Sequence, residues 1–180
     1  MTRRLTITTL ALALAVLCLG IGSATAPAKA AAPTKIGVFD SRAVALAYWR
    51  SDVGMRELRA LHEEYAKAKA ANDETRIKEL EQEGPWRQVR MHQQVFSTAT
   101  AATILEKVSD KLPGVAKEAG VSAIVSKWEV PYKDASIETV DVTLSIVRLF
   151  NQDPQTLKMI QEMSAQPPIP FEKLPLDPNM

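Results

Sequence analysis

Cysteine is almost absent from this sequence of 180 residues. Cys18 is the only one, and it lies inside an apolar run near the N-terminus. Beyond that run, disulfides, thiol catalysis and cysteine-type zinc or iron–sulfur sites are therefore excluded. The stability of such a chain in an oxidising compartment has to come from packing or from oligomerisation.

Histidine and glycine are scarce too. His62 and His92 are the only histidines, and no His-Glu-x-x-His motif joins them. They lie at unequal distances from an expected chain reversal near Asn72, so solvated side chains are a better interpretation than a shared metal site. Glycine occurs at only five positions after residue 30, without a phosphate-binding loop or a Gly-x-Ser-x-Gly motif. We therefore expect neither an enzyme nor a bound cofactor or metal.

A charge excess of one sign is also lacking. Without residues 1–32 the chain carries 19 basic and 21 acidic residues, a net charge of about −2. A nucleic-acid-binding protein would show a basic excess, so nucleic acid is not an expected partner. The remaining length of about 150 residues suggests one domain with a modest core.

The N-terminus has the layout of a secretory signal peptide. Arg3 and Arg4 precede an apolar run that ends at Ile21, and an Ala-x-Ala cleavage site ends at Ala30. We expect a signal peptide over residues 1–30 and an exported protein, periplasmic or else secreted. The alternative, a retained membrane helix, is weaker because the apolar run is shorter than the ~20 residues that span a bilayer.

After the cleavage site, apolar residues indicate a strand over 35–40 that passes directly into a helix. Asp40 or Ser41 can cap this helix. With Arg42 they are also a candidate polar ligand site, for which the preferred interpretation is a helix cap followed by a surface arginine. The helix is apolar on almost every side over residues 43–49, and we expect a second chain to cover it.

Two long helical arms are predicted, over residues 41–71 and 73–119. They carry mainly apolar residues three and four positions apart, as in a coiled-coil seam. These are Met55, Leu58, Leu61 or His62, Tyr65 and Ala68 in the first arm, and Trp86, Val89, Gln93, Phe96, Thr100, Ile104, Val108, Leu112 and Val115 in the second. Asn72 and Asp73 suit a reversal between the arms. Gly84-Pro85 predicts a break or kink in the second arm, and Gly120 its end.

The rest of the chain alternates between strands and helices. Strands are predicted over 121–130 and 137–142, with a short helix after them. An additional helix over 152–165 starts with a capping aspartate and a proline. The tail, residues 166–180, holds five prolines and is expected to be extended and unstructured, with docking onto a partner as the alternative. The predicted fold class is α+β.

This order of elements resembles that of the Skp/OmpH family of periplasmic chaperones. The resemblance lies in three segments, residues 35–49, 120–126 and 141–150. The similar region is a domain over 31–151. The resemblance implies a small β-sheet body with a projecting antiparallel helical hairpin, and a homo-oligomer, a trimer in that family. It also implies that the arms enclose unfolded outer-membrane proteins.

The function predicted from this resemblance is that of an ATP-independent holdase, which binds unfolded polypeptides through its helical arms. The candidate contacts are large apolar residues on the arms, with a place in the core as the alternative: Tyr65, Trp86, Met91 and Phe96. The second hypothesis is a structural or adaptor protein of the cell envelope, whose hairpin docks on one folded partner.

Overall fold

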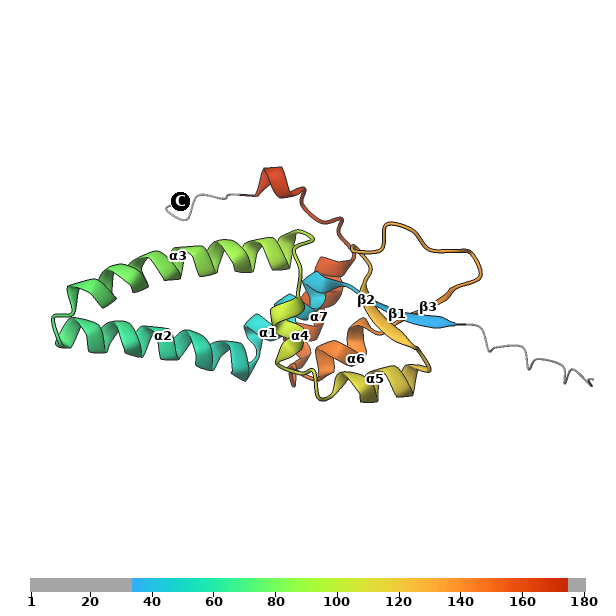
Figure 1. Cartoon of the computed structure of the whole chain (residues 1–180), viewed down its shortest axis with the longest axis horizontal. Coiled ribbons are helices and arrows are strands. Elements are labelled where there is room, and N and C mark those ends of the chain that lie inside the picture. The colour runs from blue at the N-terminus through green and yellow to red at the C-terminus, as the bar shows by residue number, and fades with distance from the viewer. Residues whose placement is uncertain (1–33, 175–180) are drawn as a thin grey trace, which may run out of the picture. The chain divides into compact units, whose positions relative to one another are not determined.

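The described chain contains a small parallel sheet of three strands. The computed structural model describes residues 34–174 (Figure 1). In it β1 (Lys35–Phe39) lies between β2 (Ala123–Ser126) and β3 (Glu138–Asp141) and pairs with both in parallel. All three strands fall within the predicted ranges, although β2 is shorter than predicted. The predicted signal peptide and the end of the tail lie outside the described residues.

Helices make up most of the described chain. In chain order they are α1 (Ser41–Arg50), α2 (Asp52–Ala70), α3 (Glu74–Phe96), α4 (Ala102–Glu106), α5 (Leu112–Ala119), α6 (Thr143–Arg148), α7 (Pro154–Ser164) and the 3-10 helix η1 (Phe171–Lys173). The fold is therefore α+β, rich in helix with a small parallel sheet. The described residues all belong to one compact unit.

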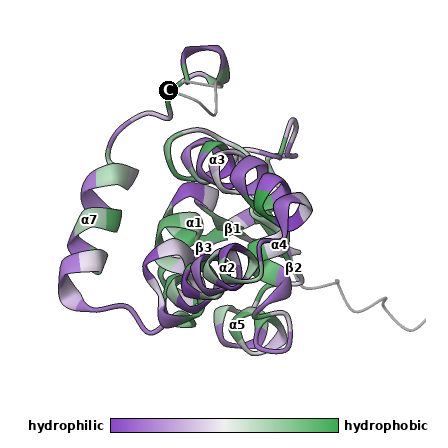
Figure 2. Ribbon diagram, turned by 90° about the vertical axis from the view of Figure 1, so that its left-hand side faces the viewer, coloured by the Kyte–Doolittle hydropathy of each residue, from purple (hydrophilic) through white to green (hydrophobic). Residues whose placement is uncertain are grey.

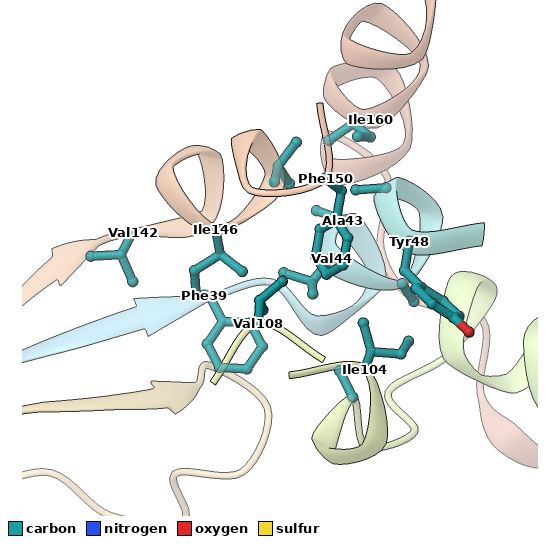
Figure 3. Packing of buried hydrophobic residues seen from close by; sticks show 14 of the residues in the cluster. Phe39, Ala43, Val44, Tyr48, Ile104, Val108, Val142, Ile146, Phe150 and Ile160 are labelled. Carbon is teal, nitrogen blue, oxygen red and sulfur yellow. The ribbon is translucent and has the colours of Figure 1, made fainter. Parts of the chain in front are cut away.

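Helix α1 lies at the centre of the hydrophobic core. It contacts α2, α3, α4, α6 and α7, and Figure 2 shows it among α2, α3 and α4 with α7 on its other side. Its residues Ala43, Val44 and Ala47 are completely buried. In Figure 3 side chains of β1, α4, α6 and α7 meet those of α1. The expectation that a second chain covers this helix is wrong, because the same chain supplies the cover.

The first predicted arm, 41–71, is two helices. The chain is extended at Ser51, whose hydroxyl accepts a hydrogen bond from the Gly54 N–H and so caps α2. Ser51 also donates to the carbonyl of Tyr48 at the end of α1. One buried serine thus satisfies backbone groups of both helix ends, and the break costs few hydrogen bonds.

The second predicted arm, 73–119, is wrong beyond Phe96. Helix α3 ends there, and the chain turns back to form α4 and α5. The apolar residues that suggested a continuing seam, Ile104, Val108 and Val115, are instead buried in the core. Their spacing is helical, but Ile104 lies in α4, Val108 in the turn after it and Val115 in α5.

At Gly84-Pro85 a break or a kink is predicted. The break is wrong, because α3 continues as one helix through both residues, and the kink stays a prediction. The other local signals are confirmed. Asn72 has a left-handed conformation (φ 52°) and Asp73 caps α3, while Gly120 (φ 65°) ends α5. Asp153 caps α7 ahead of a proline.

The tail was predicted to be unstructured, but its described part, residues 166–174, packs on its own chain. The Gln166 carbonyl accepts a hydrogen bond from Arg42, and the Ile169 N–H donates to the Phe96 carbonyl. Leu174 is buried. The segment therefore joins the end of α7 to the end of α3.

Candidate functional site

Helices α2 and α3 lie side by side, joined by the turn at residues 71–73 (Figure 1). Near the turn they are closely packed, with Ala68 and Leu80 both buried. Arg76 pairs with Glu64 across the two helices at 2.8 Å. This end of the pair is held by direct packing and by an ion pair.

Farther from the turn the two helices enclose an open groove of about 530 Å³. Its walls are mainly apolar: Trp49, Leu58, Leu61, Leu80, Pro85 and Met91. Tyr65 also lines the groove, and its hydroxyl donates a hydrogen bond to the Glu81 carboxylate at 2.8 Å. Arg87 lines the groove as well. The groove therefore combines apolar walls with a few fixed polar groups, as small-ligand and peptide sites do.

The groove exists because α3 has little bulk at Gly84 and Pro85. A Cβ built on Gly84 would meet no atom within 4 Å, so a larger residue here would occupy the groove. Pro85 has no N–H, and therefore cannot bond the Glu81 carbonyl one turn earlier. Both Pro85 and Glu81 line the groove, and the Glu81 carbonyl lacks its usual helical donor.

The four predicted contact residues are divided between two places. Tyr65 and Met91 line the groove. Trp86 is 56% exposed and does not line it. Phe96 is 44% exposed at the end of α3, where its ring lies 5.6 Å from that of His92. The structure therefore brings Tyr65 and Met91 together and leaves Trp86 and Phe96 outside the groove.

A cluster around Glu57 joins the base of the groove to the body. The Glu57 carboxylate accepts hydrogen bonds from Tyr48 of α1, Arg87 of α3 and Lys107, which follows α4. The Arg87 guanidinium also lies over the ring of Trp49, a groove residue. The cluster thus fixes α2 and α3 relative to α1 and to the chain after α4.

The electrostatics of this cluster favour an ionised Glu57. Burial alone raises its pKa, but the hydrogen bonds from Lys107 and Tyr48 outweigh burial and lower the pKa below its ordinary value. The pKa of Tyr48 is raised by burial and by the neighbouring Glu57. Tyr48 therefore remains a hydrogen-bond donor at neutral pH, and the cluster keeps its pairing.

A second polar centre lies where the strands end. Asp40 and Arg42 are both 2% exposed and pair at 2.9 Å. Asp40 also accepts from the Lys127 ammonium and the Trp128 indole, both directly after β2. The interpretation of Arg42 as a surface arginine is wrong: the tail and Trp128 cover it. The capping role of Asp40 is confirmed, because it accepts from the Arg42 N–H.

A second cavity, of about 550 Å³, adjoins this centre. It is lined by the charged residues Asp40, Lys127 and Asp141 at the carboxyl ends of the three strands, which is where open parallel sheets often bind ligands. Here Asp40 and Lys127 bond each other, and Asp141 accepts from the Thr143 N–H. Asp40 and Lys127 are thus paired within the protein, whereas the Ser164 hydroxyl, which lines the same cavity, is buried without a hydrogen-bond partner.

The pH dependence of stability is expected to report on this centre. Burial raises the pKa of Asp40, but hydrogen bonds from Arg42 and Lys127 outweigh burial and lower the pKa from 3.8 to about 2. The unfolded chain therefore takes up this proton at a higher pH than the folded chain. The stabilisation is complete above about pH 4 and is lost as the pH falls toward about 2. It amounts to roughly 2 kcal/mol.

Urea unfolding of the wild type and of Asp40→Asn at several pH values between about 5 and 2.5 measures this contribution. The difference in unfolding free energy between the two proteins should shrink on acidification, because the variant has no carboxyl group to protonate. A difference that stays constant over this range would contradict the lowered pKa of Asp40.

Several groove residues were not recognised as site residues from the sequence. The spacing of Leu58 and Leu61 was the available signal, but it suggested a closed seam rather than an open groove. Gly84 next to a proline indicates a helix break, although a small residue on the inner face of a helix also leaves room for a ligand. Nothing local in the sequence pointed to Glu57, whose partners come from three separate segments.

Within residues 34–174, no helix is both long and apolar enough to cross a membrane. The same part of the chain contains no group of three or more side chains placed to hold a metal ion. Comparison with family models, curated proteins and solved structures gave no match. The resemblance to Skp/OmpH proteins therefore remains a prediction from the segments quoted above.

Proposed function

We propose that the protein is an exported, ATP-independent holdase, which binds apolar segments of unfolded proteins in the groove between α2 and α3. The groove itself carries the proposal, because an apolar hollow kept open in a folded chain normally marks a binding site. Its volume of about 530 Å³ lies within the range of roughly 300–1,000 Å³ that is usual for ligand sites. Unfolded proteins supply the apolar side chains that would fill it.

The fixed polar groups of the groove suit an extended segment. The Glu81 carbonyl, which Pro85 deprives of its helical partner, can accept a hydrogen bond from a client N–H. An extended client has such N–H groups free, whereas a helical client has used them internally. A client would leave once its own folding buries the apolar side chains that the groove holds, so no nucleotide is required.

In this proposal α2 and α3 are the projecting antiparallel hairpin of a Skp/OmpH-like body, and the protein works in the periplasm. The trimer rests on the family resemblance alone, because α1 is already buried within one chain. The mass in solution, measured by light scattering over a dilution series, distinguishes a trimer from a monomer. A monomer would leave the groove as the binding site but remove the arrangement of arms around a shared body.

Filling the groove should weaken client binding. In Gly84→Leu the new side chain enters space that is open in the wild type, and leucine is a better helix former than glycine. We expect the variant to fold and to bind an unfolded client about tenfold more weakly, since the apolar contacts of roughly one side chain are lost. The measurement is the affinity for a fluorescently labelled, permanently unfolded protein.

Gly114→Leu is the matched control. Gly114 lies in α5, away from the groove, and a Cβ there also meets nothing within 4 Å. The control should bind clients as the wild type does. Equal weakening in both variants, or in neither, would contradict the groove as the client site.

The adaptor function is a second candidate. Two hydrogen bonds, Tyr65–Glu81 and Arg87–Glu57, favour it because they hold the polar groups of the groove in place. A rigid binding site suits one defined partner. Aggregation assays with several unrelated unfolded proteins distinguish the two functions. A holdase suppresses aggregation of most of them, whereas an adaptor suppresses none and recovers one folded envelope protein in a pull-down.

A further inference from the structure

The cavity at the carboxyl ends of the strands contains a buried hydroxyl without a hydrogen-bond partner. Ser164 is the last residue of α7, and its Oγ is buried and bonds no other group within residues 34–174. The same residue lines the cavity of about 550 Å³ beside Asp40. A buried hydroxyl without a partner destabilises the folded protein, so it needs an explanation. Here the cavity leaves room for a ligand that supplies the missing bond.

Two charged residues of the same cavity have bonding capacity left for a ligand. The Lys127 ammonium pairs with Asp40 at 2.9 Å, and the lysine side chain is 37% exposed. An ammonium has three N–H groups, and within the described residues Asp40 is its only acceptor. Asp141 accepts from the Thr143 N–H through Oδ1 at 2.8 Å, and its Oδ2 has no partner in the described chain. The cavity therefore offers a positive donor and a negative acceptor.

These two charged groups come from different strand ends. The strands β2, which leads to Lys127, and β3, which ends at Asp141, lie on either side of β1. Lys127 reaches across to Asp40, the residue after β1, so its ammonium lies about one strand spacing, roughly 5 Å, from the end of β3. A ligand that pairs with both groups therefore carries a negative and a positive group only a few atoms apart.

The other walls of the cavity argue against several ligand classes. Leu144, Ile160 and Ala165 give it an apolar part, and Leu144 is 42% exposed. A sugar would leave hydroxyls unpaired against these side chains. A phosphate would meet two carboxylates, those of Asp40 and Asp141, and a single lysine. Opposite charges beside an apolar wall instead suit a small zwitterion with an apolar side chain.

We propose that this cavity binds a free α-amino acid with an apolar side chain. The carboxylate of the ligand accepts hydrogen bonds from the Lys127 ammonium and the Ser164 hydroxyl, and its ammonium donates to Oδ2 of Asp141. The side chain of the ligand packs against Leu144 and Ile160. These five residues do not line the groove between α2 and α3, so the inference does not depend on the proposed function.

Isothermal titration calorimetry of the complete protein with L-leucine, L-valine and L-methionine tests the site. We expect these amino acids to bind. L-Leucinamide, which lacks the carboxylate, and 4-methylpentanoate, which lacks the ammonium, should each bind about tenfold more weakly than L-leucine, because one charge-assisted hydrogen bond is lost. Absence of binding by all three amino acids overturns the inference, and so does equal affinity for L-leucine and both analogues.

Ser164→Ala tests the buried hydroxyl. The hydroxyl has no partner in the free protein, and alanine is a better helix former than serine, so the unfolding free energy without ligand should not fall. The affinity for L-leucine should fall about tenfold. Ser145→Ala is the matched control, because Ser145 lies in α6 and does not line the cavity. A loss of stability with unchanged affinity would give Ser164 a structural role and contradict the site.

Asp141→Asn tests the charge on the other side of the ligand. Asparagine keeps an oxygen that can accept from the Thr143 N–H but has no negative charge for the ligand ammonium. The preference for L-leucine over 4-methylpentanoate should therefore disappear in this variant. A preference that persists unchanged would mean that Asp141 does not bind the ammonium, and the orientation proposed for the ligand would be wrong. None of these measurements uses a client protein, so their failure and that of the Gly84→Leu test are distinguishable.

Discussion

Replacing Asp40 by alanine is expected to destabilise the protein by about 3–5 kcal/mol. The Arg42 guanidinium is 2% exposed and would lose its carboxylate partner, leaving a buried charge with the Gln166 carbonyl as its remaining hydrogen-bond acceptor. The variant also loses the side chain that caps α1. The unfolding free energy in urea at neutral pH measures the effect.

Asp153→Ala is the control for a cap without a buried ion pair. Asp153 caps α7 by the same type of hydrogen bond and also accepts from the buried Thr156 hydroxyl, but it pairs with no buried cation. Its loss should cost about 1–2 kcal/mol. The double variant Asp40→Ala/Arg42→Met should recover much of the stability, because it also removes the buried, unpaired charge of Arg42. If Asp40→Ala lowers the unfolding free energy no more than Asp153→Ala does, the buried ion pair contributes little to stability.

Gly54→Ala should have the second largest effect, a loss of about 3 kcal/mol. The added methyl group would overlap the Tyr48 carbonyl oxygen and lie 3.2 Å from the Trp49 Cα, both of them backbone atoms. Neither can rotate away, so α1 and α2 have to separate at their junction. Thermal and urea unfolding of the purified variant measure the loss.

Gly84→Ala is the natural comparison, since Gly84 also lies inside a helix but has open space beside it. Alanine there should stabilise the protein by about 0.5–1 kcal/mol, the usual gain of replacing glycine within a helix. The two substitutions are chemically identical and opposite in expected sign. A neutral or stabilising Gly54→Ala would show that the junction adapts more easily than the close approach of the backbones implies.

The features that could be predicted from the sequence are those set by neighbouring residues. The strand that starts at Lys35, the cap at Asp40 and the left-handed turn at Asn72 each depend on a few adjacent side chains. The helix end at Gly120 and the cap at Asp153 are of the same kind. Such signals are local because capping and left-handed geometry involve one turn of chain.

The features that could not be predicted depend on partners far along the chain. Arg42 is buried because Trp128 and Gln166 cover it, and no local pattern reports that. Ile104 and Val115 have helical spacing, but spacing alone does not say whether the opposite surface is another arm or the core. The groove could be predicted only in part, since Tyr65 and Met91 were identified and the role of Gly84 was not.

The position of β1 has a consequence for the order of folding. It is the middle strand of the sheet, yet it precedes nearly all the helices, and its residue Lys35 pairs with Glu138, 103 positions later. Contacts so distant form slowly, whereas α2 and α3, joined by a short turn, form on local contacts. A chain that emerges from its N-terminus first has no partner for β1 until residue 123 is available. The groove can therefore form before the three strands have paired. Pairing of the strands is then the slowest step in folding.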